Sequence, residues 1–353
     1  MLKASVRGGL AAAVVVALAS CTTPEPPPPP PPPQVPDLVL NEGVAQAAAV
    51  YVAFIRDVSS IQAGFPDAAS VQAALRKGAA YEPNQLSRGM IAYGAILALQ
   101  EPEFVAGLRA YAADPSARRI MIDRIIAEPT AVSTLAGADK AAGLIIDTLG
   151  KDSTTMANIA EAVEGDAYTI QERTDPRRSW AITPVPNRPE RIQAVKDLSA
   201  TALLPSPEES ARLFAAAHTP GGLGVAGNAA RGPYTPAVSR SLAIAALAAL
   251  GAGGDDYRRN TDALSAEPTT EFCLNMSKLM LYQCMAASRP SYEDMFCVGR
   301  HIARDLATCT AQSLTPGPLS IPSAPAVEPG GVVTTPEQST TPAPAQTPAP
   351  TAP

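Results

Sequence analysis

Six prolines that each follow an acidic or hydroxyl residue constrain the fold of this chain most, because each marks the start of a helix. The pairs are Glu101-Pro102, Asp114-Pro115, Glu128-Pro129, Ser206-Pro207, Thr235-Pro236 and Glu267-Pro268. Proline is tolerated in the first helical turn, where its missing N–H would have no partner, and Asp, Ser or Thr before it can cap the free amides. The spacing of Pro102, Pro115 and Pro129 predicts consecutive short helices of about three turns.

Apolar residues recur at helical spacing through most of the chain. The expected helices lie over residues 43–63, 67–77, 152–173, 189–203 and 235–250. Gly64 with Pro66 ends the first of them, and Gly78 closes the second. The segment 235–250 is apolar on all sides but too short to span a membrane, so we expect a buried central helix. The predicted fold class is all-α, a single multi-helix globular domain of short helices, and its alanine-rich composition implies closely approaching helices.

The N-terminus has the pattern of a signal peptide. Lys3 and Arg7 precede an uncharged run over residues 10–19, which is too short for a retained membrane span. A plain secretory signal would also explain residues 1–20. However, Leu18-Ala19-Ser20-Cys21 resembles the lipobox of bacterial lipoproteins. That resemblance implies that Cys21 becomes the lipidated first residue. Thr22 stands where an inner-membrane retention signal has Asp, which favours the outer membrane, facing the periplasm.

Proline-rich segments flank the expected domain of residues 37–312. Residues 21–36 contain an unbroken run from Pro26 to Pro33, which we expect to form polyproline II and to act as a stiff spacer after the lipid anchor. Residues 313–353 are rich in Pro, Thr, Ser and Ala and are expected to be a disordered tail. The domain between them is long enough to bury a real core.

The mature chain is acidic. The sequence has 27 Lys and Arg against 33 Asp and Glu, and two of the basic residues, Lys3 and Arg7, leave with the signal. This excess of negative charge argues against nucleic acid or an anionic lipid surface as the partner. We therefore expect membrane contact through the lipid anchor, and an envelope protein or the cell wall as the partner.

Four cysteines lie in the last quarter of the domain: Cys273, Cys284, Cys297 and Cys309. With Cys21 assigned to lipid, they are an even number in an exported chain, which predicts two disulfides. A structural zinc site is the rival interpretation, but zinc ligands come in pairs two to four residues apart, and this sequence has no such pair. We therefore expect neither a metal nor a cofactor.

Two helical stretches connect these cysteines, over residues 276–287 and 292–308, with a break at Pro290 and with Ser291 and Asp294 as caps of the second stretch. Folded as an antiparallel hairpin, they favour nested pairing of Cys284 with Cys297 and of Cys273 with Cys309. The sequence alone allows three connectivities. The arrangement is similar to the stapled hairpin of twin-cysteine helical proteins, although its spacings are longer.

Candidate catalytic residues are few. His301 and Asp305 are four residues apart on the second hairpin helix and could form a base with its orienting carboxylate. Such a pair is more often a surface or capping interaction. Glu161 and Glu164 are interpreted as the solvated face of a helix. We therefore assign no catalytic residue and keep His301 and Asp305 as weak candidates.

Two loops are candidates for binding. The connector over residues 175–187 holds three prolines and Trp180, and is either a binding loop or a surface crossover with Trp180 against the core. Gly222, Gly224 and Gly227 match the G-x-G-x-x-G pattern of dinucleotide sites, but no strand precedes them. We interpret this segment as a flexible loop.

The mature domain also resembles alanine-rich lipoproteins of alphaproteobacteria whose function is unknown, around residues 273–279 and 292–297. That resemblance supplies no activity. The leading hypothesis is a non-enzymatic binding or scaffolding component of the cell envelope. A hydrolase acting on an envelope polymer is the first alternative, and a carrier of lipid or a small molecule is the second.

Overall fold

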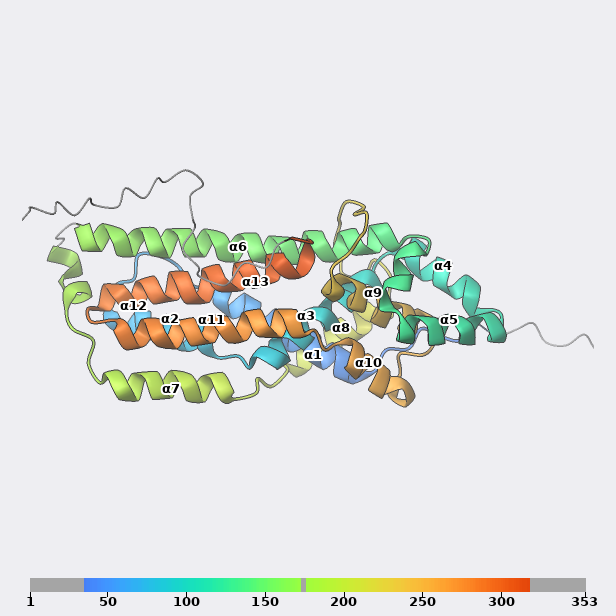
Figure 1. The fold of residues 1–353 in the computed structure, drawn as a ribbon, viewed down its shortest axis with the longest axis horizontal. Helices are drawn as coiled ribbons and strands as arrows, with labels where there is room; N and C mark the ends of the chain where they lie inside the picture. The colour runs from blue at the N-terminus through green and yellow to red at the C-terminus, as the bar shows by residue number, and fades with distance from the viewer. Residues whose placement is uncertain (1–34, 173–175, 318–353) are drawn as a thin grey trace, which may run out of the picture. The chain divides into compact units, whose positions relative to one another are not determined.

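Helices and their connections make up the part of the chain that the computed structural model describes, residues 35–172 and 176–317 (Figure 1). No strand occurs among these residues, so the prediction of an all-α domain is confirmed. None of the described helices is long and apolar enough to cross a membrane. The predicted signal peptide, Cys21 and the proline run lie outside the described residues, as does the tail from residue 318.

The α-helices alternate with a few short helical segments of other types. The α-helices are α1 (Glu42–Ser59), α2 (Ala68–Ala79), α3 (Pro83–Ala98), α4 (Pro102–Ala112), α5 (Pro115–Ala127), α6 (Ala138–Glu172), α7 (Arg188–Ala200), α8 (Pro207–Ala217), α9 (Pro236–Ala249), α10 (Arg258–Leu264), α11 (Pro268–Ala287), α12 (Ser291–Val298) and α13 (Asp305–Leu314). The 3-10 segments are η1 (Pro129–Thr134), η2 (Pro176–Ile182) and η3 (Asp255–Tyr257), and η4 (Gly299–Arg304) is a π-helical turn between α12 and α13.

Residues before a proline cap helices as the sequence predicts. The Asp114 carboxylate accepts hydrogen bonds from the backbone N–H groups of Ser116 and Ala117 at the start of α5. The Thr235 hydroxyl likewise accepts one from the N–H of Val238 at the start of α9. Glu82, which precedes Pro83 and is absent from the predicted starts, caps α3 in the same way. Side-chain acceptors thus satisfy amides that have no partner within the helix.

The helices predicted between Pro102, Pro115 and Pro129 are α4 and α5, of 11 and 13 residues. Pro129 also begins a helical segment, but it is the short 3-10 segment η1, and the chain then reverses at Gly137, whose φ is 74°. A Cβ at Gly137 would lie 2.4 Å from the backbone nitrogen of Phe104, so a side chain there would collide with α4. The turn and the close approach therefore leave no room for a longer helix.

The core is built around α3 and α9, both of which are buried along most of their length. The prediction of a buried central helix over residues 235–250 is confirmed by α9. Its Ser241 hydroxyl donates a 3.0 Å hydrogen bond to the carbonyl of Ile91 on α3. A Cβ at Gly94 would lie 2.5 Å from the same hydroxyl, and one at Gly89 would lie 2.6 Å from the carbonyl oxygen of Ala47 on α1. Glycines thus permit the close helix approach that the composition implies.

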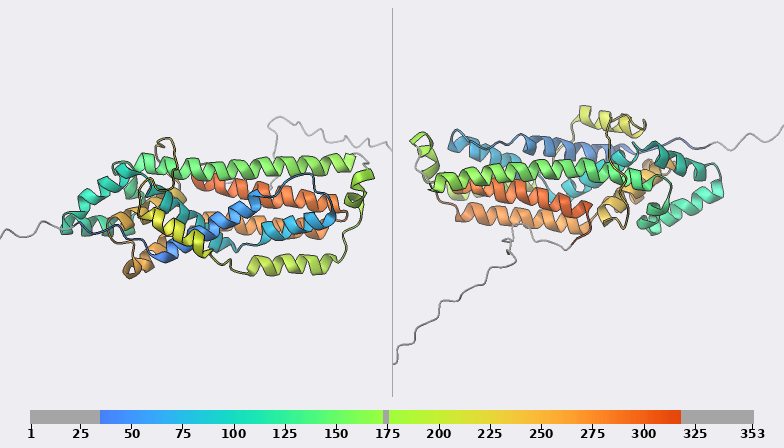
Figure 2. Two further views of the ribbon diagram at one scale, coloured as in Figure 1. Left: turned by 180° about the vertical axis from the view of Figure 1, so that it is seen from behind. Right: turned by 90° about the horizontal axis from the view of Figure 1, so that it is seen from above.

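Helix α6 corrects the predicted helix over residues 152–173. It is one continuous helix of 35 residues that begins at Ala138 and passes through Gly150 without a break. It contacts α12, η4 and α13 along one side, and Figures 1 and 2 show these elements side by side. Because α6 spans about 50 Å, it can brace the C-terminal hairpin from end to end.

Other boundaries differ by smaller amounts. Helix α1 ends at Ser59 rather than at residue 63, and Gly64 follows with a φ of 81°. Helix α13 continues to Leu314, and both Ser313 and Leu314 are buried, so the predicted domain end at Gln312 is two residues too early. At the other end, Val35 already packs against the core, inside the segment predicted as spacer.

Candidate functional site

The C-terminal hairpin consists of α11 on one side and α12, η4 and α13 on the other. Two disulfides connect its sides, Cys273–Cys309 and Cys284–Cys297, with Cα–Cα distances of 5.6 and 5.8 Å. This is the nested pairing that the antiparallel geometry favours. Except for half-buried Cys284, these cysteines are buried. The disulfides therefore join the two sides of the hairpin at the surface where these sides pack together.

Asp294 does not cap α12 as predicted. The residue before α12 is Pro290, and no side chain caps the helix. Instead, the fully buried carboxylate of Asp294 forms an ion pair with Arg191 of α7 and accepts 2.6 Å hydrogen bonds from Gln72 Nε2 and Ser288 Oγ. A buried carboxylate needs such partners, and these partners come from other segments, which a local pattern does not reveal.

His301 and Asp305 lie together in the structure. The Nδ1 atom of His301 is 3.3 Å from Oδ2 of Asp305, and His301 lies in the π-helical turn η4. The Asp305 carboxylate is fully buried, and the His301 side chain is only 12% exposed. Four cavities lie beside the Cys273–Cys309 disulfide, between α2 and α7, between α1 and α8, and beside the end of α6 at η2, and neither residue lines any of them. The pair therefore has the contact that a base and its orienting group need, but it lies outside these four cavities.

The interpretation of Glu164 as solvated is wrong, although Glu161 is exposed. Glu164 is buried, and its two carboxylate oxygens accept hydrogen bonds of 2.7 and 3.2 Å from Nε and Nη2 of Arg304. These hydrogen bonds raise the pKa of the Arg304 guanidinium above its usual value. The pair joins α6 to the hairpin and has a structural role.

One buried cation stands out among the described residues. Lys278 of α11 donates a 2.8 Å hydrogen bond to the carbonyl of Ala79, and its Nζ lies 3.8 Å from the centre of the Tyr81 ring. Burial lowers the pKa of Lys278 to about 7, although the nearby Glu82 acts in the opposite direction. A lysine with a lowered pKa can act as a nucleophile or base, but Lys278 lines none of the four cavities that we describe.

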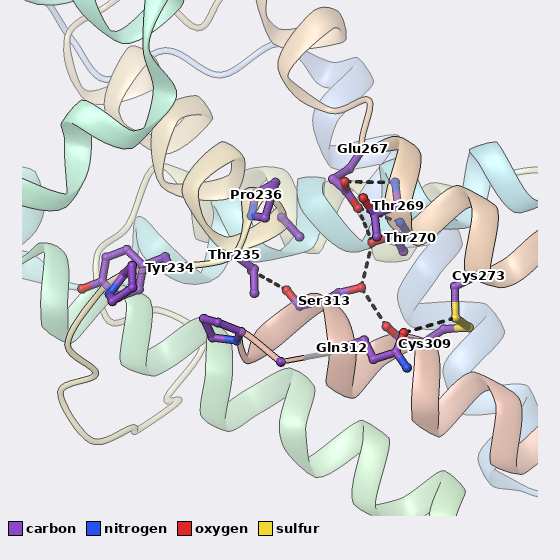
Figure 3. A pocket seen from close by; sticks show the side chains of 14 residues that line it. Tyr234, Thr235, Pro236, Glu267, Thr269, Thr270, Cys273, Cys309, Gln312 and Ser313 are labelled. Atoms are coloured by element: carbon purple, nitrogen blue, oxygen red, sulfur yellow. Dashed lines mark hydrogen bonds between the residues drawn. A yellow bond between two sulfur atoms is a disulfide. The ribbon is translucent and has the colours of Figure 1, made fainter. Parts of the chain in front are cut away.

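A cavity of about 270 Å³ lies beside the Cys273–Cys309 disulfide, where the starts of α9 and α11 meet the end of α13 (Figure 3). Its polar groups bind one another. The Thr270 hydroxyl hydrogen-bonds both the Glu267 carboxylate, at 2.6 Å, and the Ser313 hydroxyl, at 2.7 Å. Burial alone would raise the pKa of Glu267, but the hydrogen bonds from Thr270 and Thr269 bring it below its usual value. These groups brace the junction of three helices.

The two candidate loops are held against the domain. In the glycine-rich segment, the backbone N–H groups of Leu223 and Asn228 donate to the side chains of Gln100 and Asp147. The segment is a loop, and its flexibility stays a prediction. The segment follows α8 without a strand, unlike a dinucleotide site. In the connector, Trp180 packs against the core, and the N–H of Val185 donates to the carbonyl of Arg289.

The outer face of α11 has a feature that the sequence analysis did not identify. Its exposed residues are Pro268, Thr269, Phe272, Asn275, Leu279, Gln283, Ala286 and Ala287, none of which is charged. Phe272 is 61% exposed and Leu279 45%. Met276 and Met280, both half-buried, lie near them on the same helix. We call these eight exposed residues the α11 face. Helix α11 lies at the front of the domain in Figure 1.

Comparison of the chain with protein-family models, with curated proteins and with solved structures finds no match.

Proposed function

We propose that this chain is a membrane-anchored lipoprotein of the cell envelope that binds an envelope protein through the α11 face. The anchor is Cys21, which follows the lipobox-like residues Leu18-Ala19-Ser20, and the spacer of residues 21–36 separates it from the helical domain. By the same resemblance, the anchor lies in the outer membrane and the domain faces the periplasm.

The observation that carries the binding role is the absence of charge along the α11 face. Exposed helix faces in soluble proteins usually carry charged residues. Cores of protein interfaces, in contrast, are depleted of Lys, Glu and Asp and enriched in aromatic residues and Met. The α11 face follows the second pattern, since Phe272 and Leu279 are exposed one heptad apart with methionines close by.

The hairpin gives this face a fixed backbone. The Cys273–Cys309 and Cys284–Cys297 bonds hold α11 to α12 and α13, and α6 packs against the other side of those helices. A preordered surface loses less conformational entropy on binding than a flexible one. A rigid helix of this kind suits a scaffold.

The chemistry of the face also indicates the kind of partner. A charged polymer or an anionic lipid surface would be recognised by charged side chains, which the α11 face does not have. An apolar, uncharged surface on another protein is complementary to it. The hydrolase alternative has less support, because His301 and Asp305 adjoin none of the described cavities. The carrier alternative also has less support, because none of these cavities is enclosed.

Site-specific photocrosslinking in intact cells tests the binding role. A photoreactive residue at position 272 or 279 should give one covalent adduct with an envelope protein, and the same residue at Ser116 on exposed α5 is the matched control. With the photoreactive residue at 272, a further Leu279→Ser change should remove the adduct while circular dichroism stays unchanged. Equal labelling from position 116, adducts only with lipid or wall fragments, or adducts only with a second copy of this chain would overturn the proposed partner.

The anchor is tested separately by the Cys21→Ala variant. Wild-type protein should incorporate radiolabelled palmitate and sediment with outer membranes, whereas the variant should do neither. An unlabelled wild-type protein, or a variant that stays in the membrane fraction, would refute the anchor without affecting the argument for the α11 face.

A further inference from the structure

A pocket of about 390 Å³ is lined by residues of α2 and α7 together with Ser291 at the start of α12. Figure 1 shows these three helices at the same end of the domain. Part of its wall is apolar and comes from Ala69, Val185 and Val195. The polar part includes two arginines, Arg76 and Arg191, and no acidic residue lines the pocket. A mainly apolar pocket with a few convergent polar groups is the usual form of a small-molecule site.

Arg191 is a built-in cation at this pocket. Its side chain is 9% exposed, and its two Nη atoms are committed, one to the Asp294 carboxylate and the other to the carbonyl of Met285 at 3.0 Å. Its Nε–H is buried and does not reach the pocket surface, so Arg191 forms a fixed part of the pocket wall.

Arg76 is the second arginine that lines the pocket. It is exposed near the end of α2 and makes no ion pair with another described residue. Arg191, in contrast, is balanced by Asp294. The net charge of the pocket lining is therefore positive and comes from a side chain that is available to a ligand.

The start of α7 adds backbone donors. Asn187, which lines the pocket, precedes this 13-residue helix with a left-handed backbone, φ 47° and ψ 48°, and its side chain caps none of the free amides. A left-handed conformation costs energy for residues other than glycine, and such residues are often found at binding sites. The helix dipole favours a negative group at this end of α7, although Pro189 contributes no N–H and the first turn contains Glu190, which does not line the pocket.

We infer that the pocket between α2 and α7 binds a small carboxylate that carries a short apolar body. The carboxylate lies against Arg76 and the first turn of α7, and the apolar body fills the wall of Ala69, Val185 and Val195. An inorganic anion would leave that wall empty, and a neutral apolar molecule would leave Arg76 unpaired. The inference uses none of the residues of the α11 face and stands or falls independently of the proposed partner.

Calorimetric titration of the full mature protein tests the inference. Octanoate is the acyl probe and N-acetyl-Ala-Ala is the peptide probe, so the two arms distinguish a fatty acid from a peptide C-terminus as the source of the carboxylate. Loss of one charge-assisted hydrogen bond in Arg76→Gln should weaken the tighter of the two by about tenfold. Ala69→Leu should abolish binding by filling the apolar wall. Arg119→Gln, which removes an exposed arginine from α5, is the matched charge control and should leave the affinity unchanged.

Two comparisons complete the test. The uncharged probe n-octanol and inorganic phosphate should each bind more weakly than octanoate by about tenfold or more, because each lacks one half of the required chemistry. Equal binding of octanoate and n-octanol would overturn the inference. So would equal affinities of the wild type and Arg76→Gln, an equal loss in Arg119→Gln, or no binding of either carboxylate by a protein whose circular dichroism shows it to be folded.

Discussion

The two disulfides should contribute unequally to stability, and the difference can be worked out from their nesting. The test pairs are Cys284→Ala with Cys297→Ala for the inner bond and Cys273→Ala with Cys309→Ala for the outer bond. The inner bond joins residues 13 apart in sequence and the outer bond residues 36 apart. Because the inner bond lies within the outer loop, it shortens the chain that the outer bond closes.

The chain-entropy relation converts these loops into free energies. Closing the inner loop reduces the entropy of the unfolded chain by an amount worth about 3 kcal/mol at 25 °C. The outer loop alone would give about 3.8 kcal/mol, and with the inner bond in place the effective loop shortens and the value falls to about 3.4 kcal/mol. Removing both bonds should therefore cost about 6.4 kcal/mol rather than the larger sum of two independent loops.

Urea unfolding followed by circular dichroism measures these losses. All variants are compared in a Cys21→Ala background to exclude the proposed lipid modification, and the reduced form of this background protein is a control in which none of the four hairpin sulfur atoms is deleted. The outer pair should lose slightly more stability than the inner pair, with a small extra loss where Ala leaves a gap at the buried Cys309. Peptide mapping of the oxidised protein checks the pairing.

Three outcomes would refute this reasoning. Loss of less than about 1 kcal/mol in either double variant would show that the hairpin forms in the unfolded chain, so that its closure costs little entropy. A quadruple variant no less stable than the outer double variant would show that the inner bond contributes nothing. Peptide mapping that joins Cys273 to Cys284 or to Cys297 would exclude the nested pairing itself.

Three further predictions concern buried charge and close packing. Asp152→Asn should raise the free energy of unfolding by about 2 kcal/mol at pH 7.5, because burial raises the pKa of the Asp152 carboxyl to about 6. The folded state then binds more protons than the unfolded state between about pH 4 and 6, so wild-type stability should fall as pH rises through that window, and urea unfolding should find this slope absent from the variant. Lys278 should have the opposite effect: its folded-state pKa of about 7 lies below the ordinary 10.5, so the unfolded state binds more protons above pH 7 and the free energy of unfolding rises with pH there. Lys278→Met should remove this rise, and urea unfolding at pH 6, 7.5 and 9 measures it. Gly143→Ala should release the glycine-rich segment from α6 and raise its hydrogen exchange, because the new Cβ would lie 1.7 Å from the carbonyl oxygen of Asn228. Gly150→Ala on the same helix, where a Cβ meets nothing within 4 Å, should instead stabilise the protein by about 1 kcal/mol, and an equal effect of the two changes would contradict the packing argument.

The features that sequence predicts here are those whose causes are local. A capping side chain and its proline lie within four residues of the amides they serve, so the starts of α4, α5, α8, α9 and α11 follow from the sequence. The uninterrupted apolar run of α9 likewise predicts its burial. The nested disulfides follow from cysteine spacing once two antiparallel helices are assumed.

The features that sequence misses depend on distant partners. Glu164 is buried where Arg304, 140 residues later in the chain, donates hydrogen bonds to its carboxylate. The Lys278 ammonium group is shielded from solvent because it packs against the carbonyl of Ala79 and the ring of Tyr81. The continuity of α6 through Gly150 is a different case, since a single glycine weakens a helix without ending it, and the packing of α6 along α12 and α13 offsets that cost.

The proposed pocket and the α11 face are neighbours in the fold, yet the geometry predicts that they act independently. Arg191 bonds both Asp294 and the carbonyl of Met285, so it connects α7 to the end of α11. Coupling between two sites requires an element with two arrangements that both ligands bias. Here Cys284–Cys297 fixes the adjoining helices, and a carboxylate at Arg76 leaves the bonds of Arg191 in place.

Saturating octanoate should therefore change the affinity of this protein for the envelope partner identified by photocrosslinking by less than about threefold, or about 0.7 kcal/mol. The same limit must hold for the effect of that partner on octanoate, because coupling free energies of binding are reciprocal. Titrating each ligand in the presence of the other measures both values, with Ala69→Leu as the variant in which the octanoate effect must vanish. A larger shift that is equal in both directions would show that the stapled end of the domain has a second arrangement, and the argument from rigidity would then be wrong for this hairpin.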